Sequence, residues 1–191
     1  GYTNQRVIVF DAVTGVFKRL WGAYGDSPDD GPQEPLNPDG PAPQRWDPTH
    51  CVRVAYDGLV YVCDRGADRV QVFQIDGTFV QEVQFAPNTR SQGSTWDIAF
   101  SPDAAQTYLY LADGQNMKVY IMDRESLEIL TSFGDGGRQP GLFFAVHSIA
   151  TDSEGNIYTT ETYEGKRVQK FLYQGIGAVT AENQGAPWPG R

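Results

Sequence analysis

One short phrase recurs four times along the chain of 191 residues. Each copy is a basic residue, then valine, then a run that ends on a large apolar side chain. An alternation with a period of two is typical of a β-strand with one buried face. The copies are Arg6–Phe10, Arg69–Phe73, Lys118–Met122 and Arg167–Phe171, and they begin 63, 49 and 49 residues apart. A repeat of this length indicates a fold assembled from one supersecondary unit.

Two further phrases precede the last three copies and complete the unit. One is a short apolar strand that ends on an acidic residue, at Val60–Asp64, Leu109–Asp113 and Ile157–Glu161. The other lies before it across a turn signal, at His50–Val54, Trp96–Phe100 and His147–Thr151. A fourth strand follows the basic phrase, as in Thr78–Val83 and Leu127–Phe133. Each unit is therefore predicted to be a sheet of four short antiparallel strands.

These sheets predict an all-β fold of the β-propeller type. A lone four-stranded sheet cannot bury both of its faces, whereas sheets packed radially around a channel do so. The innermost strands, which line the channel, are those that begin at His50, Trp96 and His147. We predict the last strands of one blade at 1–21, a Pro/Gly/Asp-rich loop at 22–45, blades at 46–85, 95–133 and 146–181, and a tail at 182–191.

Charge and cysteine usage limit the class of protein. The net charge of −9 argues against nucleic acid, which needs a clustered basic surface. No apolar run is long enough for a membrane span. Cys51 and Cys63 flank the turn signal at Asp57-Gly58, which places them on adjacent strands. They are predicted either to form a cross-strand disulfide or to remain two buried thiols. A disulfide would imply an oxidising compartment, extracellular or periplasmic.

The two histidines are the residues that most favour chemistry. His50 and His147 are the only ones in the chain, and each opens an inner strand, 97 residues apart. They are expected on one rim of the channel, with Arg65 and Tyr2 in the loops that reach the same end. A phenol beside a cation has a lowered pKa and can act as a base. The alternative is structural: Tyr2 covers a core, and Arg65 pairs with a carboxylate such as Asp64 or Asp68.

The segment Tyr61–Phe73 resembles the NHL repeat, with a strand that ends in Asp, a short loop and then Arg-Val-x-apolar-Phe. This resemblance covers most of the chain and implies a six-bladed propeller when complete. The chain would supply about three to four blades. The missing N-terminal blades would complete the propeller, or a homodimer would close it.

A narrower resemblance is to the peptidyl-α-hydroxyglycine α-amidating lyases. The motifs that carry it are Gly1–Val7, Trp21-Gly22, Pro48–Cys51, Asp64-Arg65 with Arg69, His147–Ile149 and Gly155–Tyr158. It implies that His50 and His147 bind zinc, with a third histidine missing from this chain. It also implies that Tyr2 is the catalytic base and that Arg65 contacts substrate and tunes Tyr2. A structural calcium is doubtful, because Ser148 stands where the family often has Asp.

Three functions remain open from the sequence, so whether the protein is an enzyme is left undecided. One is a binding scaffold for a small peptide-like ligand or a protein partner, with a metal site on the channel rim. Another is a zinc-dependent lyase that releases glyoxylate from a carbinolamide. The third is a calcium-dependent, lactonase-like propeller, for which Asp97 is the inner-strand carboxylate. Trp96 is either a substrate-binding platform or a hydrophobic plug, and Asp29-Asp30 either binds calcium or belongs to a solvated loop.

Overall fold

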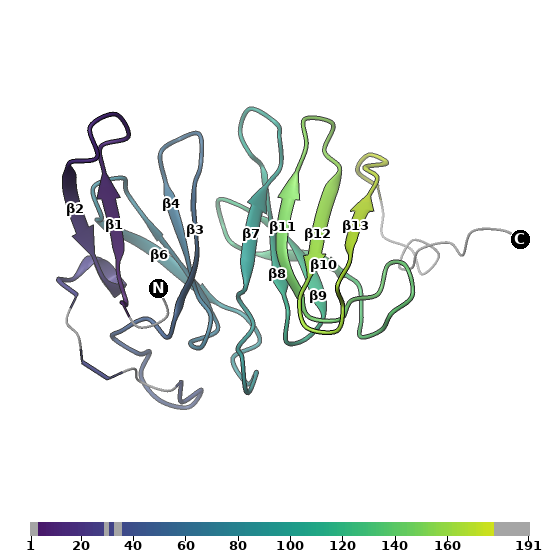
Figure 1. Ribbon diagram of the computed structural model, residues 1–191, viewed down its shortest axis with the longest axis horizontal. Helices are drawn as coiled ribbons and strands as arrows, with labels where there is room; N and C mark the ends of the chain where they lie inside the picture. Colours follow the sequence, from purple (N-terminus) through teal and green to yellow (C-terminus); the bar gives the residue numbers. More distant parts are fainter. Residues whose placement is uncertain (1–3, 29–30, 33–35, 178–191) are drawn as a thin grey trace, which may run out of the picture. The chain divides into compact units, whose positions relative to one another are not determined.

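The computed structural model describes residues 4–28, 31–32 and 36–177, and the strands in these ranges pair antiparallel throughout (Figure 1). Apart from strands and turns, the described residues contain one short 3₁₀ turn, η1 (Ala23–Gly25). The all-β prediction is therefore confirmed. The chain divides into two compact units, Gly1–Thr95 and Trp96–Arg191.

The first unit holds a two-stranded and a four-stranded sheet. The two-stranded sheet is a hairpin of β1 (Val7–Phe10) and β2 (Phe17–Trp21). The larger sheet has the order β3 (Thr49–Val54), β4 (Val60–Asp64), β5 (Arg69–Phe73) and β6 (Phe79–Gln84). Consecutive strands are neighbours, as the predicted blade at 46–85 requires. The turn between β3 and β4 forms at Asp57-Gly58, where Gly58 takes a φ of 86° and the Asp57 carboxylate accepts the Leu59 N–H.

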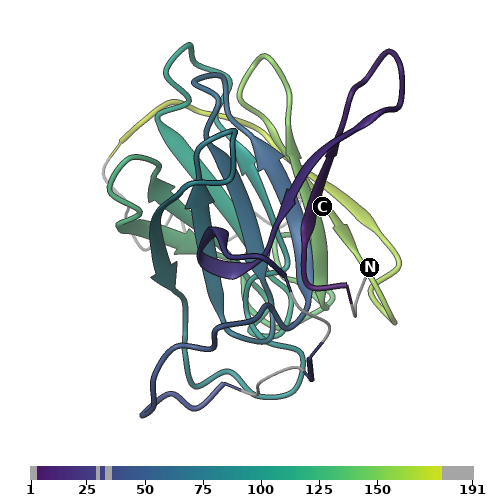
Figure 2. The ribbon, with the colours of Figure 1, turned by 90° about the vertical axis from the view of Figure 1, so that its left-hand side faces the viewer.

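Large aromatic side chains fill the core of this unit. Trp21, Trp46 and Phe73 are buried, and their rings pack at centroid distances of 5.9 to 6.0 Å about Phe73. Val7 and Val9 pack against the same cluster, so one face of the hairpin lies on the β3–β6 sheet (the purple hairpin in Figure 2). Ala23 of η1 is also buried in this core. The predicted loop at 22–45 therefore contributes a packed residue at its start.

The second unit holds a four-stranded and a three-stranded sheet. The first has the order β7 (Asp97–Phe100), β8 (Tyr108–Asp113), β9 (Lys118–Asp123) and β10 (Ile129–Phe133). The second has the order β11 (Val146–Thr151), β12 (Ile157–Glu161) and β13 (Val168–Phe171). Residues 178–181 of the predicted third blade, and the tail at 182–191, lie outside the described residues.

The two sheets of the second unit pack face to face. Buried residues of β7 to β9, such as Ala99 and Val119, form one core with Val146 and Ile149 of β11. The inner strands are also tied directly, because the Thr151 hydroxyl donates to the Phe100 carbonyl at 2.7 Å. Radial packing of blade on blade, which the sequence predicts, is thus present within this unit.

A backbone signature marks every copy of the basic phrase. The residue just before the basic side chain takes a left-handed conformation, with a φ between 44° and 59°. These residues are Gln5, Asp68, Met117 and Lys166, which precede Arg6, Arg69, Lys118 and Arg167. The shared conformation identifies β1 as the counterpart of β5, β9 and β13. The hairpin therefore corresponds to the third and fourth strands of a blade.

Candidate functional site

His50 is the extra residue of a β-bulge at the start of an inner strand. In the pairing of β3 with β4, Thr49 faces Asp64 and Cys51 faces Cys63, so His50 has no opposite residue on β4. A bulge of this kind interrupts the alternation of the strand and re-aims one side chain. The His50 side chain is half-buried.

His147 occupies the same kind of bulge in the second unit. In the pairing of β11 with β12, Val146 faces Glu161 and Ser148 faces Thr160, and His147 is the extra residue. Its imidazole lies edge-on to Trp96, with ring centroids 5.3 Å apart, and its Nδ1 is 3.4 Å from the Ser148 hydroxyl. The sequence predicts that both histidines open an inner strand, and in the structure each is the second residue of the first strand of its sheet. The structure adds the bulge, which no sequence pattern showed.

The acidic residue that ends the second strand fixes each bulge. In the first unit, Asp64 is fully buried and accepts the Asp47 N–H at 2.6 Å and the Arg69 guanidinium at 2.8 Å. The Arg65 N–H also donates to the Pro48 carbonyl at 3.2 Å. The segment that leads into His50 is thus tied to the turn after β4. The guanidinium that binds Asp64 in this way is that of Arg69.

The second unit repeats this arrangement with different residues. Glu161 accepts the Phe144 N–H at 3.0 Å and the Arg167 guanidinium at 2.6 Å. The Thr162 N–H donates to the Ala145 carbonyl at 3.1 Å. Both bulges therefore rest on a carboxylate that bridges the incoming backbone and the basic residue of the third strand. Asp64 and Glu161 are structural groups in this arrangement.

Arg69 is the centre of a buried polar network that sequence reasoning did not single out. Its side chain is fully buried and donates to Asp64, to Glu82, to the Tyr24 hydroxyl at 2.7 Å and to the Arg45 carbonyl. Tyr24 in turn donates to Glu82 at 3.1 Å. Burial raises the pKa of Tyr24, and the Arg69 charge opposes that rise. The Tyr24 phenol is therefore held in its neutral form and ties η1 to the sheet.

Arg65 lies half-buried in the turn after β4, where its charge acts on Asp47. Burial raises the pKa of the Asp47 carboxyl above its ordinary value, and the Arg65 guanidinium lowers it again. The Asp68 carboxylate, which the structural alternative paired with Arg65, accepts the Ser94 N–H at 2.6 Å. Tyr2 and the acidic pair Asp29-Asp30 lie outside the described residues. The proposed approach of Tyr2 to Arg65 stays a prediction.

The middle blade presents no histidine at the position that corresponds to the bulges. Trp96 precedes β7 there and is only 2 % exposed, and a Cβ added to Gly114 would come within 2.4 Å of its ring. Both interpretations of Trp96, a hydrophobic plug and a substrate platform, stay predictions. Asp97 is also buried, and its carboxylate accepts the N–H groups of Ile98 and Ile149 at 2.9 and 3.2 Å.

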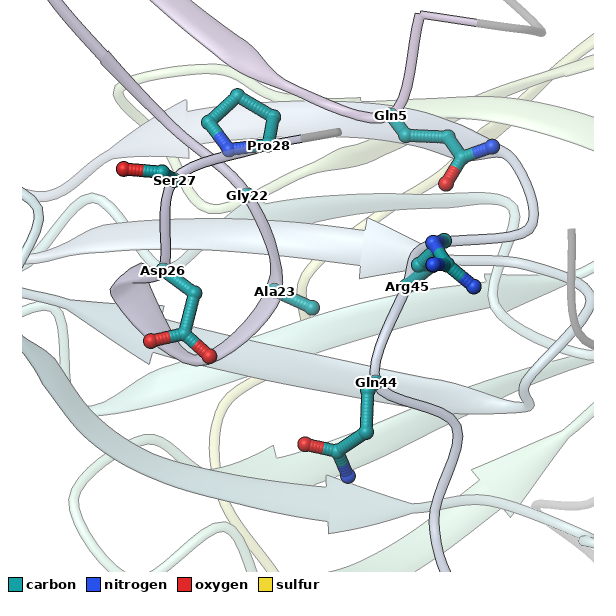
Figure 3. A pocket seen from close by; sticks show the side chains of 8 residues that line it. All are labelled: Gln5, Gly22, Ala23, Asp26, Ser27, Pro28, Gln44 and Arg45. Carbon is teal, nitrogen blue, oxygen red and sulfur yellow. The ribbon is translucent and has the colours of Figure 1, made fainter. Parts of the chain in front are cut away.

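A small polar cavity lies elsewhere in the first unit, between the start of β1 and η1 (Figure 3). Its volume is about 160 Å³, and its lining includes Gln5, Asp26, Gln44 and Arg45. The Gln5 amide nitrogen donates to the Gly31 carbonyl at 3.0 Å, whereas its buried carbonyl oxygen has no protein partner among the described residues. No sequence signal pointed to this cavity.

Among residues 4–28, 31–32 and 36–177, no three His, Cys, Asp or Glu side chains gather as a group that could hold a metal ion. The same ranges contain no helix that is long and apolar enough to span a membrane. The predicted disulfide is present: Cys51 and Cys63 are bonded, with their Cα atoms 4.8 Å apart.

The family model described as "Lactonase, 7-bladed beta-propeller" matches residues 26–133, which is more than half of the chain. The chain belongs to this seven-bladed lactonase family. The propeller prediction is thereby confirmed. The propeller of this family has seven blades, one more than the six that the NHL resemblance implied. The matched region runs from Asp26, directly after η1, to the end of β10, and it includes the bulge at His50. The NHL and amidating-lyase resemblances are not confirmed by this match.

Solved structures show the same fold at low sequence identity. Virginiamycin B lyase from Staphylococcus aureus is 14 % identical, with a TM-score of 0.55 over 91 % of this chain and 50 % of that one. A streptogramin B lyase is 13 % identical, with a TM-score of 0.56 over 91 % and 49 %. The β-propeller domain of Myceliophteria thermophila Cps50 (Swd1) is 14 % identical, with a TM-score of 0.56 over 88 % and 47 %. The lactonase-family chain described here thus spans about half the length of these structures.

Proposed function

We propose that the intact protein binds a small ligand at the end of the propeller channel where the inner strands begin, with His50 and His147 as ligand-facing groups. The observation that carries this proposal is the repeated bulge. Each histidine is the extra residue of a β-bulge in its strand, one residue after the cross-strand partner of the acid that ends the second strand. Bulges are frequent next to active sites because they re-aim a side chain. Imidazole can donate, accept and exchange a proton near neutral pH.

Repeat equivalence is the reason to expect both imidazoles on one rim of the intact propeller. His50 lies 14 residues before Asp64, and His147 lies 14 residues before Glu161. Equal offsets in equivalent blades put equivalent positions at the same end of the channel. Arg65, in the turn beside the first bulge, would add a positive charge to this rim. The family description favours a cyclic ester as the ligand class.

Binding can be tested with δ-valerolactone as the probe and the full-length protein as the receptor. Saturation-transfer NMR should detect binding to the wild type. We expect His50→Ala and His147→Ala each to weaken it about fivefold, because each removes about one hydrogen bond to a neutral ligand. Tyr56→Ala is the matched control, since Tyr56 is exposed beyond the opposite end of β3. Equal affinity in all four proteins would refute the proposal.

Hydrolysis of the cyclic ester is a second candidate function, favoured by the family match across residues 26–133. Water would add to the ring carbonyl and the ring C–O bond would break, which yields the open hydroxy acid. A half-buried imidazole suits the transfer of the water proton. The Asp97 carboxylate is buried and accepts one backbone N–H on each oxygen, and it gathers with no group of three His, Cys, Asp or Glu side chains among the described residues that could hold a metal ion. We therefore derive no step through calcium.

Turnover of δ-valerolactone to its hydroxy acid can be followed by proton NMR. If an imidazole is the base, its removal should lower kcat/KM by about 10²-fold to 10⁴-fold. The measurement compares wild type, His50→Ala, His147→Ala and the Tyr56→Ala control. If the wild type binds δ-valerolactone but does not turn it over, the binding function stays and the hydrolase function is excluded.

Zinc is the metal that the two imidazoles fit as ligands, as the amidating-lyase resemblance implies. Three protein ligands are usual at a catalytic zinc, so a third would have to come from outside the described residues. Bound zinc would polarise a substrate oxygen, and Tyr2 would be the base of the carbinolamide-cleaving alternative. Equal zinc content in wild type and His147→Ala would remove this role from His147.

The disulfide supports an extracellular or periplasmic location as part of the same proposal.

A further inference from the structure

The two bulges are alike on one side of the histidine and differ on the other. Before each histidine, a carboxylate and a backbone hydrogen bond tie the incoming segment to the turn after the second strand. After His50 comes Cys51, which is bonded covalently to its cross-strand partner Cys63. After His147 comes Ser148, whose cross-strand partner is Thr160. The covalent tie therefore exists in one bulge only.

The bulge itself does not require the disulfide. β11 and β12 form the same register shift with a serine and a threonine at the paired positions. The bridge in the first unit thus adds a restraint to a geometry that hydrogen bonds already produce. The bridge acts on Cys51, the residue directly after His50, and both Cys51 and Cys63 are buried.

The second unit restrains its histidine by other means. The His147 ring packs edge-on against Trp96 and lies within 3.4 Å of the Ser148 hydroxyl. A cysteine in a disulfide offers no hydroxyl to the preceding imidazole. The surroundings of the two histidines therefore differ, because a disulfide follows His50 whereas Trp96 and Ser148 contact the His147 ring.

We propose that the Cys51–Cys63 disulfide is a positioning element for His50, which restricts the motion of this imidazole in the folded protein. Its role in ligand recognition rests on the proposed function of the bulge histidines, whereas the restriction itself does not. Covalent closure one residue away limits the backbone rotations that would carry the ring out of its bulge. The same bridge has no direct link to His147.

The variant that tests this is Cys51→Ala/Cys63→Ala, because alanine removes the bridge and brings no hydroxyl that could contact His50 as Ser148 contacts His147. The two-histidine protein allows the modification of each imidazole by diethyl pyrocarbonate to be followed separately by peptide mass spectrometry. We expect the rate at His50 to rise about threefold or more in the folded variant, because local opening becomes easier. The rate at His147 should stay unchanged. Circular dichroism confirms that the variant is folded before the rates are compared.

A reciprocal variant decides the matter if the first one does not fold. Ser148→Cys/Thr160→Cys keeps the native bridge and adds a second one at the equivalent pair, confirmed by mass. The rate at His147 should change while the rate at His50 stays the same. Unchanged histidine rates in folded variants would overturn the proposal and leave the bridge as a stabilising cross-link only. These rates need no ligand, so failure of the binding proposal and failure of this one are distinguishable.

Discussion

At the scale of single residues, the acidic side chains that end the second strands have structural roles. The sequence showed Asp64, Asp113 and Glu161 as a repeated strand ending and placed no role on Arg69. The carboxylates of Asp64 and Glu161 accept a backbone N–H from the segment that enters the inner strand, whereas Asp113 accepts from Asn116. In the first unit, one buried guanidinium serves Asp64, Glu82 and Tyr24 together. Removal of one partner of such a buried network is costly because it strands the others.

Asp113 gives a pH-dependence that can be measured. Burial raises the pKa of Asp113 to about 6 from its ordinary value of 3.8, against the lowering effect of its bonds to Asn116. The folded state therefore holds the proton more tightly than the unfolded state. The stability that this proton confers is complete below about pH 4 and is lost as the pH rises through about 6. A shift of this size corresponds to about 2 to 3 kcal/mol.

The test compares urea unfolding at about pH 4 and about pH 7 for wild type and Asp113→Asn. The loss of unfolding free energy between the two conditions should shrink by about 2 to 3 kcal/mol in the variant. Asp103→Asn is the control, because hydrogen bonds from Ser101 and Thr107 lower the pKa of Asp103 to about 2. The contribution of Asp103 to the free energy of unfolding rises as the pH rises towards about 4 and stays constant above that pH. An identical loss in wild type and Asp113→Asn would contradict the assignment.

At the scale of elements, the strands were predictable and the bulges were not. The alternation of apolar residues and the terminal acids predicted the bounds of β4, β5 and β12 closely, because a period of two can be read directly from the order of the side chains. The bulges depend on a one-residue shift of register, which backbone hydrogen bonds at Asp47 and Phe144 decide. No sequence pattern pointed to the role of Tyr24 or to the cavity at Gln5, because both depend on a chain reversal at η1. The cysteine pair was predictable, since the Asp57-Gly58 turn fixes which strands are adjacent.

The disulfide should also contribute to the stability of the β3–β4 hairpin. It joins residues 12 apart in sequence, so it restricts a short loop in the unfolded chain. Loop-closure entropy for a loop of this size predicts a loss of about 3 kcal/mol of unfolding free energy in Cys51→Ser/Cys63→Thr. Denaturant unfolding at neutral pH measures it. A loss below about 1 kcal/mol would mean that the unfolded chain already holds these strands close.

At the scale of the whole molecule, the repeat predicted the propeller, and the family match confirms it. The number of blades was not predictable, because it depends on how many units close the ring, and this chain spans about half the length of the structures that it matches. The third strands β5 and β9 each have two neighbours, whereas their counterparts β1 and β13 each have one among the described residues. β1 pairs with β2, and β13 pairs with β12. Unpaired strand edges favour pairing with another chain.

We expect the 191-residue chain, expressed by itself, to self-associate through these edges. Apolar side chains are exposed beside both of them: Phe10 of β1 is 56 % exposed, and Val168 of β13 is 68 % exposed. Phe10→Lys together with Val168→Lys should therefore shift the chain towards its 21.1 kDa monomer in sedimentation velocity, since an edge lysine opposes strand pairing. Val13→Lys is the matched control, because Val13 is 94 % exposed but lies in the hairpin turn. A wild-type chain that stays monomeric at high micromolar concentration would show that the edges are protected. That outcome would exclude closure of the propeller by a second copy.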